Sequence, residues 1–219
     1  QTLVILTAGI DLSCGMVMAL GGIVMTKMAA DYGLSAPVAV ACGMAVTMLF
    51  GLVNGLLVTK IKLPPFIVTL GTLNIAFAAT QLYSGAQTIT DIPAGMTALG
   101  NTFQLGQTAI VWGAVLMLVL YLVTWFALRE TAPGRHVYAV GNSPEATRLT
   151  GIATDKVLLG VYVLAGLGWW EPVYRTGFAD WMTPRFGPYL PSFAFALSFV
   201  FFWWLVVWAM DKRGWYVKL

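Results

Sequence analysis

The sequence predicts an all-α membrane protein, a polytopic transmembrane helix bundle of about six spanning helices with one short helix on the cytoplasmic side. Hydrophobic residues make up 59% of the chain and charged residues 10%, with a mean hydropathy of +0.81, whereas a soluble domain carries about 25% charge. Several apolar stretches approach about 20 residues, the length with which a helix crosses the hydrocarbon core. Helices are expected there because lipid offers the backbone no hydrogen-bond partner. The stretches are Leu12–Ala30, Ala36–Thr59, Pro64–Tyr83, Thr108–Leu128 and Pro191–Met210.

The basic residues between these stretches alternate with loops that lack them. Lys and Arg occur in Lys60–Leu63, in Arg129–Lys156 and at the C-terminal end, but not in Asp31–Ala36 or Ser84–Gln107. The positive-inside rule therefore predicts that the basic loops and the C-terminus face the cytoplasm. Lys27 lies near the outer end of its predicted helix, where its side chain can reach the membrane surface.

Uncharged polar residues recur at the predicted membrane depth, and two interpretations stay open for them. They bind neighbouring helices by hydrogen bonds, or they line a polar path. Their spacing forms no single stripe, and their lack of charge suits a neutral hydrophilic solute better than an ion. Small residues at Gly51 and Gly55 form a G-x-x-x-G sequence, for which close helix packing is favoured over dimerisation. The polar residues are Asn54, Thr69, Thr72, Asn74, Thr80 and Gln81.

The segment "SPEATRLTG" predicts a short helix in the basic loop. Ser143 is a good N-cap and Pro144 suits the first helical position. Glu145 lies at the positive end of the helix dipole, Arg148 near its negative end, and Gly151 can end the helix in a left-handed conformation. Such a helix is either a docking element that receives force from a soluble motor or an ordinary interfacial helix.

Three motifs resemble those of the permease subunits of bacterial ABC importers for monosaccharides, the ribose/xylose/fructose class. "AGIDLSCG" (Ala8–Gly15) resembles G-I-D-L-S-V-G, with Cys14 in place of valine. "LPPFIVTLGTL" (Leu63–Leu73) is similar to L-P-x-F-I-x-T-L-G. "GRHVYAVGNSPEATRLTGI" (Gly134–Ile152) resembles G-R-x-x-Y-A-x-G-G-N-P-E-A-A-R-L-S-G-I, departing from it at Asn142–Ser143.

The resemblance implies a permease that moves a monosaccharide by alternating access in the bacterial inner membrane. Its short cytoplasmic coupling helix would dock on an ATP-binding cassette ATPase, a separate subunit because the chain has no G-x-x-x-x-G-K-[ST] loop. The other implied partners are a second permease copy, a periplasmic sugar-binding protein and membrane lipid, with no nucleic acid, no cofactor and no metal. The chain itself is then not an enzyme. The implied coupling residues are Ser143, Pro144, Glu145, Arg148 and Gly151.

The resemblance also bears on Asp11, because the family places this motif where a helix begins after a break in the chain. Asp11 or Ser13 would then cap the helix Leu12–Ala30, with Gly9 permitting the break. Direct contact with the sugar is the alternative, since helix ends within membranes form solute sites in other transporters. The candidates for a translocation path or helix break are Asp11, Ser13, Thr69 and Asn74.

The resemblance ends near Leu167, where the composition changes, and the sequence predicts a boundary there. Residues 1–167 form the permease core, and residues 168–219 form a Trp-rich tail with one transmembrane helix. The tail faintly resembles the C-terminal end of the heparan-alpha-glucosaminide N-acetyltransferase-like membrane proteins, so the chain is interpreted as a possible composite of two proteins. Two alternatives to a permease therefore stay open: a non-transporting structural subunit of a larger membrane complex and a fragment of a membrane acyltransferase.

Overall fold

The computed structural model describes residues 1–87, 89, 95–96, 101–105 and 108–167. These residues belong to two compact units, which are described separately below. The first holds the described residues up to 96 and from 118 to 167, and the second holds those from 101 to 117. The Trp-rich tail, residues 168–219, lies outside the described residues, and so does its predicted span Pro191–Met210.

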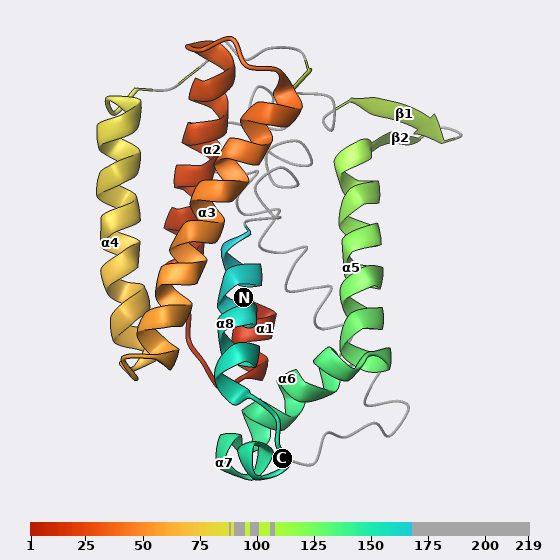
Figure 1. Ribbon diagram of the computed structural model, residues 1–219. Helices are drawn as coiled ribbons and strands as arrows, with labels where there is room; N and C mark the ends of the chain where they lie inside the picture. The colour runs from red at the N-terminus through yellow and green to blue at the C-terminus, as the bar shows by residue number, and fades with distance from the viewer. Residues whose placement is uncertain (88, 90–94, 97–100, 106–107, 168–219) are drawn as a thin grey trace. The chain divides into compact units, whose positions relative to one another are not determined.

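Three helices among the described residues are long and apolar enough to cross a membrane. They are α3 (Ala36–Thr59), α4 (Pro65–Ser84) and α5 (Trp112–Glu130) (Figure 1). α2 (Cys14–Ala30) is also apolar but has only 17 residues. The prediction of a helical protein with several membrane-spanning helices is confirmed, whereas the total of about six spans remains a prediction.

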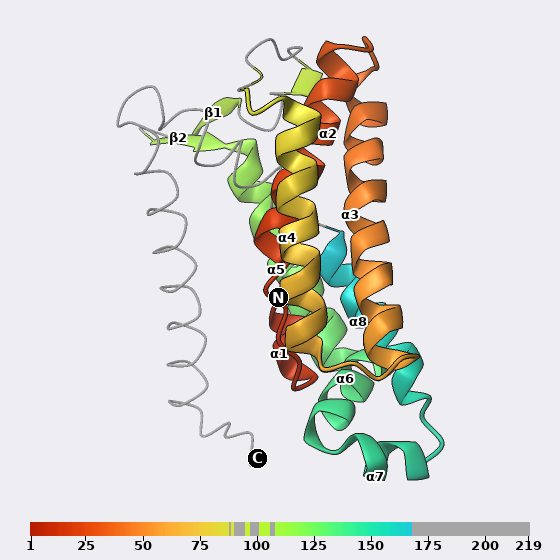
Figure 2. The same cartoon turned by 90° about the vertical axis from the view of Figure 1, so that its left-hand side faces the viewer.

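In the first unit, α2 packs against both α3 and α4 (Figures 1 and 2). α4 begins at Pro65, whose fixed backbone angle suits a first helical turn. It ends at Gly85, which takes the left-handed conformation with φ 65° that caps many helices. A buried apolar cluster joins α2 to α4 and contains Val17, Leu20, Val24 and Ala76.

Glycines bring the backbones of α3 and α8 (Thr154–Gly166) into contact. A Cβ atom on Gly51 would collide with the backbone oxygen of Tyr162 and lie 3.0 Å from the Cα of Gly166. One turn along α3, a Cβ atom on Gly55 would lie 2.7 Å from Cδ1 of Leu159. The G-x-x-x-G sequence therefore serves close packing within the chain, as predicted.

A second apolar cluster gathers short helices around α8. α1 (Thr2–Leu6) packs against α8 and against α6 (Ala132–Asn142). Each helix is too short to be stable alone, so its persistence depends on this packing. The buried members of the cluster are Val4, Val137, Val161 and Tyr162.

The predicted span Thr108–Leu128 is wrong at its start. In the second unit Thr108–Val111 forms strand β2, which pairs antiparallel with β1 (Thr102–Leu105), and α5 begins only at Trp112. β-Branched residues favour strands, and pairing between strands satisfies backbone hydrogen bonds as a helix does. The ring of Phe103 packs on that of Trp112 with centroids 4.6 Å apart, which joins the hairpin to the start of α5.

The basic loop contains a helix that the sequence analysis did not anticipate. α6 begins after Thr131, whose hydroxyl oxygen accepts the backbone N–H of Gly134 at 3.3 Å. Val137 and Val140 form its buried side. α7 (Pro144–Leu149) follows directly, so the segment that carries the third motif is a pair of packed helices.

Candidate functional site

A network of buried polar side chains lies where α1 gives way to α2. Asp11 is 4% exposed, Ser13 1% and Asn54 2%. The backbone N–H and the hydroxyl of Ser13 both donate to Oδ1 of Asp11, at 2.8 and 2.7 Å. Nδ2 of Asn54, on α3, donates to Oγ of Ser13 at 3.0 Å. Since the single hydroxyl proton of Ser13 goes to Asp11, Ser13 can only accept from Asn54.

This geometry assigns different tasks to the two residues that were expected to cap the helix. α2 begins at Cys14 rather than Leu12, and the Ser13 side chain makes no capping hydrogen bond. Asp11 instead accepts the N–H of Ser13, a donor directly ahead of the first helical turn. The Asp11 carboxyl group thus orders the start of the helix, and Ser13 links it to α3.

The residue that turns the chain at this break is Ala8, not Gly9. Ala8 has φ 58°, a left-handed conformation that residues other than glycine adopt uncommonly, whereas Gly9 does not have a positive φ. Gly9 matters for a different reason: a Cβ atom there would lie 3.0 Å from both Oη of Tyr162 and Cγ1 of Val4. The expectation that Gly9 permits the break is therefore wrong. Glycine at this position instead allows Tyr162 and Val4 to pack closely against the backbone.

Thr69 contacts the chain break beside this network, at the backbone oxygen of Ile10, whereas Asn74 lies apart from it. The hydroxyl of Thr69 donates to the backbone oxygens of Pro65, at 2.9 Å, and Ile10, at 3.3 Å. Asn74 is exposed, and its Nδ2 donates to the oxygen of Leu70 in its own helix at 2.9 Å. The structure thus brings three of the four candidates for the path or helix break together and separates the fourth.

Two polar atoms beside the network have no hydrogen-bond partner among the described residues. They are Oδ1 of Asn54 and Oη of Tyr162, both buried. Sequence reasoning missed Tyr162 because the run "VYVLAGL" gives no signal that one of its side chains faces a polar break. The described residues contain no group of three or more His, Cys, Asp or Glu side chains that could hold a metal ion.

The second candidate site is α7, and its local structure follows the predicted signals. Oγ of Ser143 accepts the backbone N–H of Ala146 at 3.3 Å, and Pro144 occupies the first turn. Glu145 lies in the first turn and Arg148 in the last. Gly151 follows with φ 86°, and its N–H donates to the oxygen of Arg148 at 3.0 Å. Three of the five predicted coupling residues thus lie in α7, and the other two, Ser143 and Gly151, flank its two ends.

α7 presents nearly all of its side chains to the outside and is held by one threonine. Thr147 is its only buried residue, and the Thr147 hydroxyl donates to the oxygens of Ala139 and Ser143, both at 2.8 Å. Leu149 is 88% exposed, more than any other large hydrophobic residue described. Sequence reasoning missed Thr147, although its position in the middle of the short helix is a weak signal for contact with a support.

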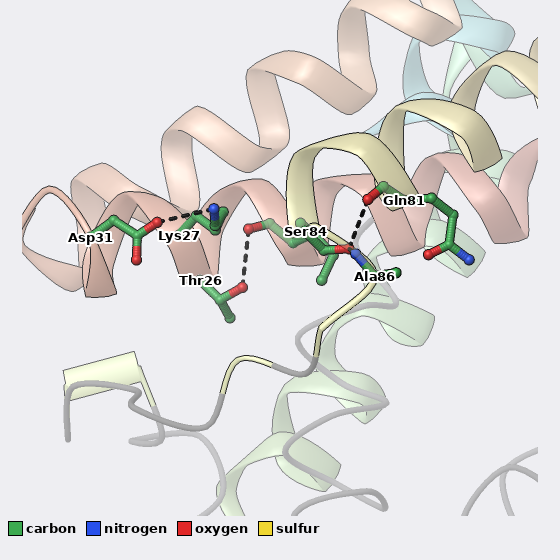
Figure 3. Close-up of polar contacts among 7 residues, drawn as sticks. Thr26, Lys27, Asp31, Gln81, Ser84 and Ala86 are labelled. Carbon is green, nitrogen blue, oxygen red and sulfur yellow. Dashed lines mark hydrogen bonds and ion pairs between the residues drawn. The ribbon is translucent and has the colours of Figure 1, made fainter.

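The opposite end of the first unit carries a polar contact between α2 and α4. Nζ of Lys27 lies 3.2 Å from Oδ2 of Asp31, four residues further along the chain (Figure 3). It also lies 5.2 Å from the ring centre of Tyr83 on α4. Beside them the turn at the end of α4 is closed by the N–H of Ala86, which donates to the backbone oxygen of Gln81 at 3.0 Å. Lys27 is thus neutralised at the helix end, where the predicted outer membrane surface lies.

Comparison with known protein families identifies the kind of protein to which these elements belong. Residues 1–169 match the family described as branched-chain amino acid transport system / permease component. The chain belongs to this family. The match ends close to the boundary predicted at residue 167, and with the candidate spans it makes the chain a multi-pass membrane protein of the permease type.

The chain is similar to several curated import permeases. It is 45% identical over 172 residues to the fructose import permease protein FrcC of Rhizobium meliloti, covering 76% of this chain and 48% of that protein. It is 36% identical over 174 residues to the ribose import permease protein RbsC of Escherichia coli K12, covering 76% and 52%. With the autoinducer 2 import system permease protein LsrC of Salmonella paratyphi B it shares 34% identity over 165 residues, covering 75% and 46%.

The chain spans about half the length of the curated relatives it matches. No solved structure matches it significantly. The comparisons favour the permease and give no support to a composite chain, a structural subunit or an acyltransferase fragment.

Proposed function

We propose that this chain forms the core of the membrane-spanning permease subunit of an ATP-driven sugar importer, which moves a monosaccharide by alternating access. The similarity to permeases named for fructose and ribose import supports the substrate class. The observation that carries the mechanism is α7, a capped helix that exposes every residue except Thr147. A short helix with so little of its surface covered by its own chain is suited to docking on a separate subunit.

In this proposal α7 transmits force from an ATP-binding cassette ATPase. The exposed Glu145 and Arg148 offer charges for docking, and the exposed Leu149 offers an apolar contact at the end of the helix. Movement of the ATPase is passed to α6 through the hydrogen bond from Thr147 to Ala139, and then to α8 and α1, which pack against α6. ATP hydrolysis belongs to the ATPase, and this chain supplies the path.

The arrangement of basic residues supports a bacterial inner-membrane orientation with α7 in the cytoplasm. The turn between α3 and α4, which carries Lys60 and Lys62, lies at the same end of the first unit as α7 (Figures 1 and 2). The turn between α2 and α3 lies at the other end and has no Lys or Arg between Asp31 and Ala36. The positive-inside rule supports a cytoplasmic position for the first end, and we propose the same side for the basic C-terminal end of the chain.

The proposal of a sugar-importer permease also implies the remaining partners. A periplasmic sugar-binding protein delivers the solute at the end opposite to α7, and a second permease copy completes the pore. Membrane lipid covers the apolar side chains of α5 that are about half exposed or more, consistent with a spanning helix. These side chains are Leu118, Val119, Leu122, Val123, Trp125 and Phe126.

The test is capture of the ATPase by the permease. We expect Glu145→Arg, placed in the first turn of α7, to lose ATPase binding about tenfold or more, because a rim charge is reversed and a cation is placed at the positive end of the helix. Affinity purification from membranes that co-express the permease with its ATPase, followed by quantification of both subunits, measures the loss.

Asp155→Arg is the matched control. Asp155 is exposed and lies in the first turn of α8, so the same charge reversal at the same place in a helix is made outside α7. ATPase capture should stay at the wild-type level in this variant. Equal capture by both variants, or equal loss in both, would contradict docking through α7.

A further inference from the structure

The polar residues of α4 lie on two different faces, which explains why their spacing forms no single stripe. Thr69 and Thr72 are buried, whereas Asn74 and Gln81 are exposed. Each buried hydroxyl donates to backbone oxygens: Thr69 to Pro65 and Ile10, and Thr72 to Val68 and Thr69. The single proton of each buried hydroxyl is therefore used within the protein, so these two buried side chains have no free donor to offer to a solute.

The exposed face has a different composition along its middle. Gly71, Asn74, Ala78 and Gln81 follow at helical spacing and lie within an arc of about 80° over a length of about 15 Å. All are exposed, and nothing lies within 4 Å of the position that a Cβ atom on Gly71 would take. Bulky exposed apolar side chains border this strip on both sides: Leu70 and Phe77 on one, Ile75 and Leu82 on the other.

The amide of Asn74 is the group that this strip leaves unexplained. It stands midway along a helix that is long and apolar enough to span a membrane, and it makes one hydrogen bond, to Leu70 of its own helix. An asparagine amide has two N–H donors and a carbonyl oxygen that can accept, so capacity for further hydrogen bonds remains. Hydrocarbon satisfies none of it, and polar groups at membrane depth face the protein interior or a water-filled cavity.

The chemistry of the strip indicates what passes along it. Asn74 and Gln81 can donate and accept hydrogen bonds but carry no charge, and the strip contains no charged residue. An ion would need charge compensation there, whereas a hydroxyl group of a neutral solute needs only the paired donor and acceptor of an amide. The small side chains at Gly71 and Ala78 leave room between the bulky borders.

We propose that the strip Gly71, Asn74, Ala78 and Gln81 on α4 lines the path of a neutral, hydroxyl-rich solute, with Asn74 and Gln81 as the residues that bind its hydroxyl groups. Gly71 and Asn74 lie near the middle of α4, and Ala78 and Gln81 lie in the half that ends at Gly85, opposite to the end with α7 (Figure 1). The strip therefore runs from the middle of the path toward its outward end. This inference rests on the proposed function and excludes Thr69 from solute contact.

Cysteine accessibility tests the inference. The background is the full chain with Cys14→Ala and Cys42→Ala, expressed in membranes with its ATPase and binding-protein partners. Asn74→Cys is compared with Ile75→Cys, which has the same depth but points about 100° away around the helix. We expect a membrane-impermeant, charged methanethiosulfonate to label Asn74→Cys about tenfold faster, because a thiolate forms far less readily in an apolar setting than in water.

The probes for solute contact are D-ribose and D-fructose at millimolar concentration. Either sugar should slow labelling of Asn74→Cys and of Gln81→Cys and leave the rate for Ile75→Cys unchanged. Equal labelling of the neighbouring cysteines, oxidative cross-linking of Asn74→Cys between two copies, or fast labelling that neither sugar slows would each overturn the inference.

A different result contradicts the proposed function: the background protein, without Cys14 and Cys42, takes up no sugar. Labelling is then compared without sugar. Faster reaction of Asn74→Cys would still support a polar path along α4, and equal rates would overturn it.

Discussion

The break before α2 and the open strip of α4 both place uncharged amides at membrane depth, but they use them in opposite ways. At the break, Asn54 binds Ser13, Ser13 binds Asp11, and all three are buried, so side chains from two segments bind one another, although Oδ1 of Asn54 has no partner among the described residues. On α4, Asn74 bonds only to its own helix and stays exposed. Polar side chains that hydrogen-bond to one another hold helices together, whereas exposed polar side chains are available to bind a solute.

The largest expected effect comes from the same substitution at a glycine in each region. Gly51→Leu should destabilise the folded protein by about 4 kcal/mol or more, because its side chain would meet the backbone of Tyr162 and Gly166, which cannot turn away as a side chain can. Thermal melting in detergent and the yield of folded protein from membranes measure this loss.

Gly71→Leu is the matched control on α4, where nothing stands in the way of a new side chain. Its melting temperature should equal that of the wild type, while sugar uptake falls because the side chain projects into the proposed path. Equal stability losses at the two glycines would break the distinction between a packed and an open region.

A smaller effect is expected from the carboxyl group at the break. Asp11→Ala leaves the N–H of Ser13 without its acceptor in a buried site, which should cost about 3 kcal/mol of unfolding free energy. Asp11→Asn keeps a side-chain oxygen in the same place and should lose about 1 kcal/mol. Denaturant titration of the purified protein in detergent compares the variants.

Asp31→Ala provides the comparison at the exposed end of α2. Asp31 pairs with Lys27, but the two side chains are 50% and 26% exposed, so the loss should stay below about 1 kcal/mol and shrink further in salt. If Asp31→Ala proved as damaging as Asp11→Ala, burial would not be what distinguishes the two carboxyl groups.

Local signals in the sequence predicted one element well and missed its neighbour. α7 was predictable because Ser143, Pro144 and Gly151 each act within a few residues, and the structure confirms the cap, the first turn and the left-handed end. α6 was not predicted, although Thr131 and Pro133 give the same kind of helix start signal. The basic residues of this segment indicate a cytoplasmic loop and do not reveal a helix within it. Hydrophobicity alone predicts a helix over Thr108–Val111, where the structure has a strand, because an apolar run does not distinguish the two.

The candidate path could be predicted only in part, for a physical reason. Sequence reasoning selected Thr69 and Asn74 for their polarity, but which of them is satisfied depends on where Ile10 and α2 lie. Likewise the close approach of Gly9 to Tyr162 joins residues distant in the chain, so no local pattern reveals it. Periodicity gives the faces of a helix, and only the tertiary structure says which face is covered.

A local effect is expected in α7, which combines both settings in one helix: an exposed outer surface and a single buried hydroxyl beneath it. Thr147→Val preserves the shape of the side chain but removes the hydrogen bonds to Ala139 and Ser143. We expect a loss of about 1 kcal/mol in the docking of α7, and so roughly fivefold faster amide hydrogen exchange in this helix alone.

Thr150→Val tests whether loss of any threonine hydroxyl in this segment speeds amide exchange in α7. Thr150 is exposed, and its hydroxyl donates only to Thr147 within the same turn, so exchange in α7 should stay at the wild-type rate. Hydrogen exchange followed by mass spectrometry resolves α7 from α6 through their separate peptides. Unchanged exchange in Thr147→Val would mean that α7 is held by something other than this hydroxyl, and the proposed transmission of force through Thr147 would then be lost while ATPase docking on the outer surface could still stand.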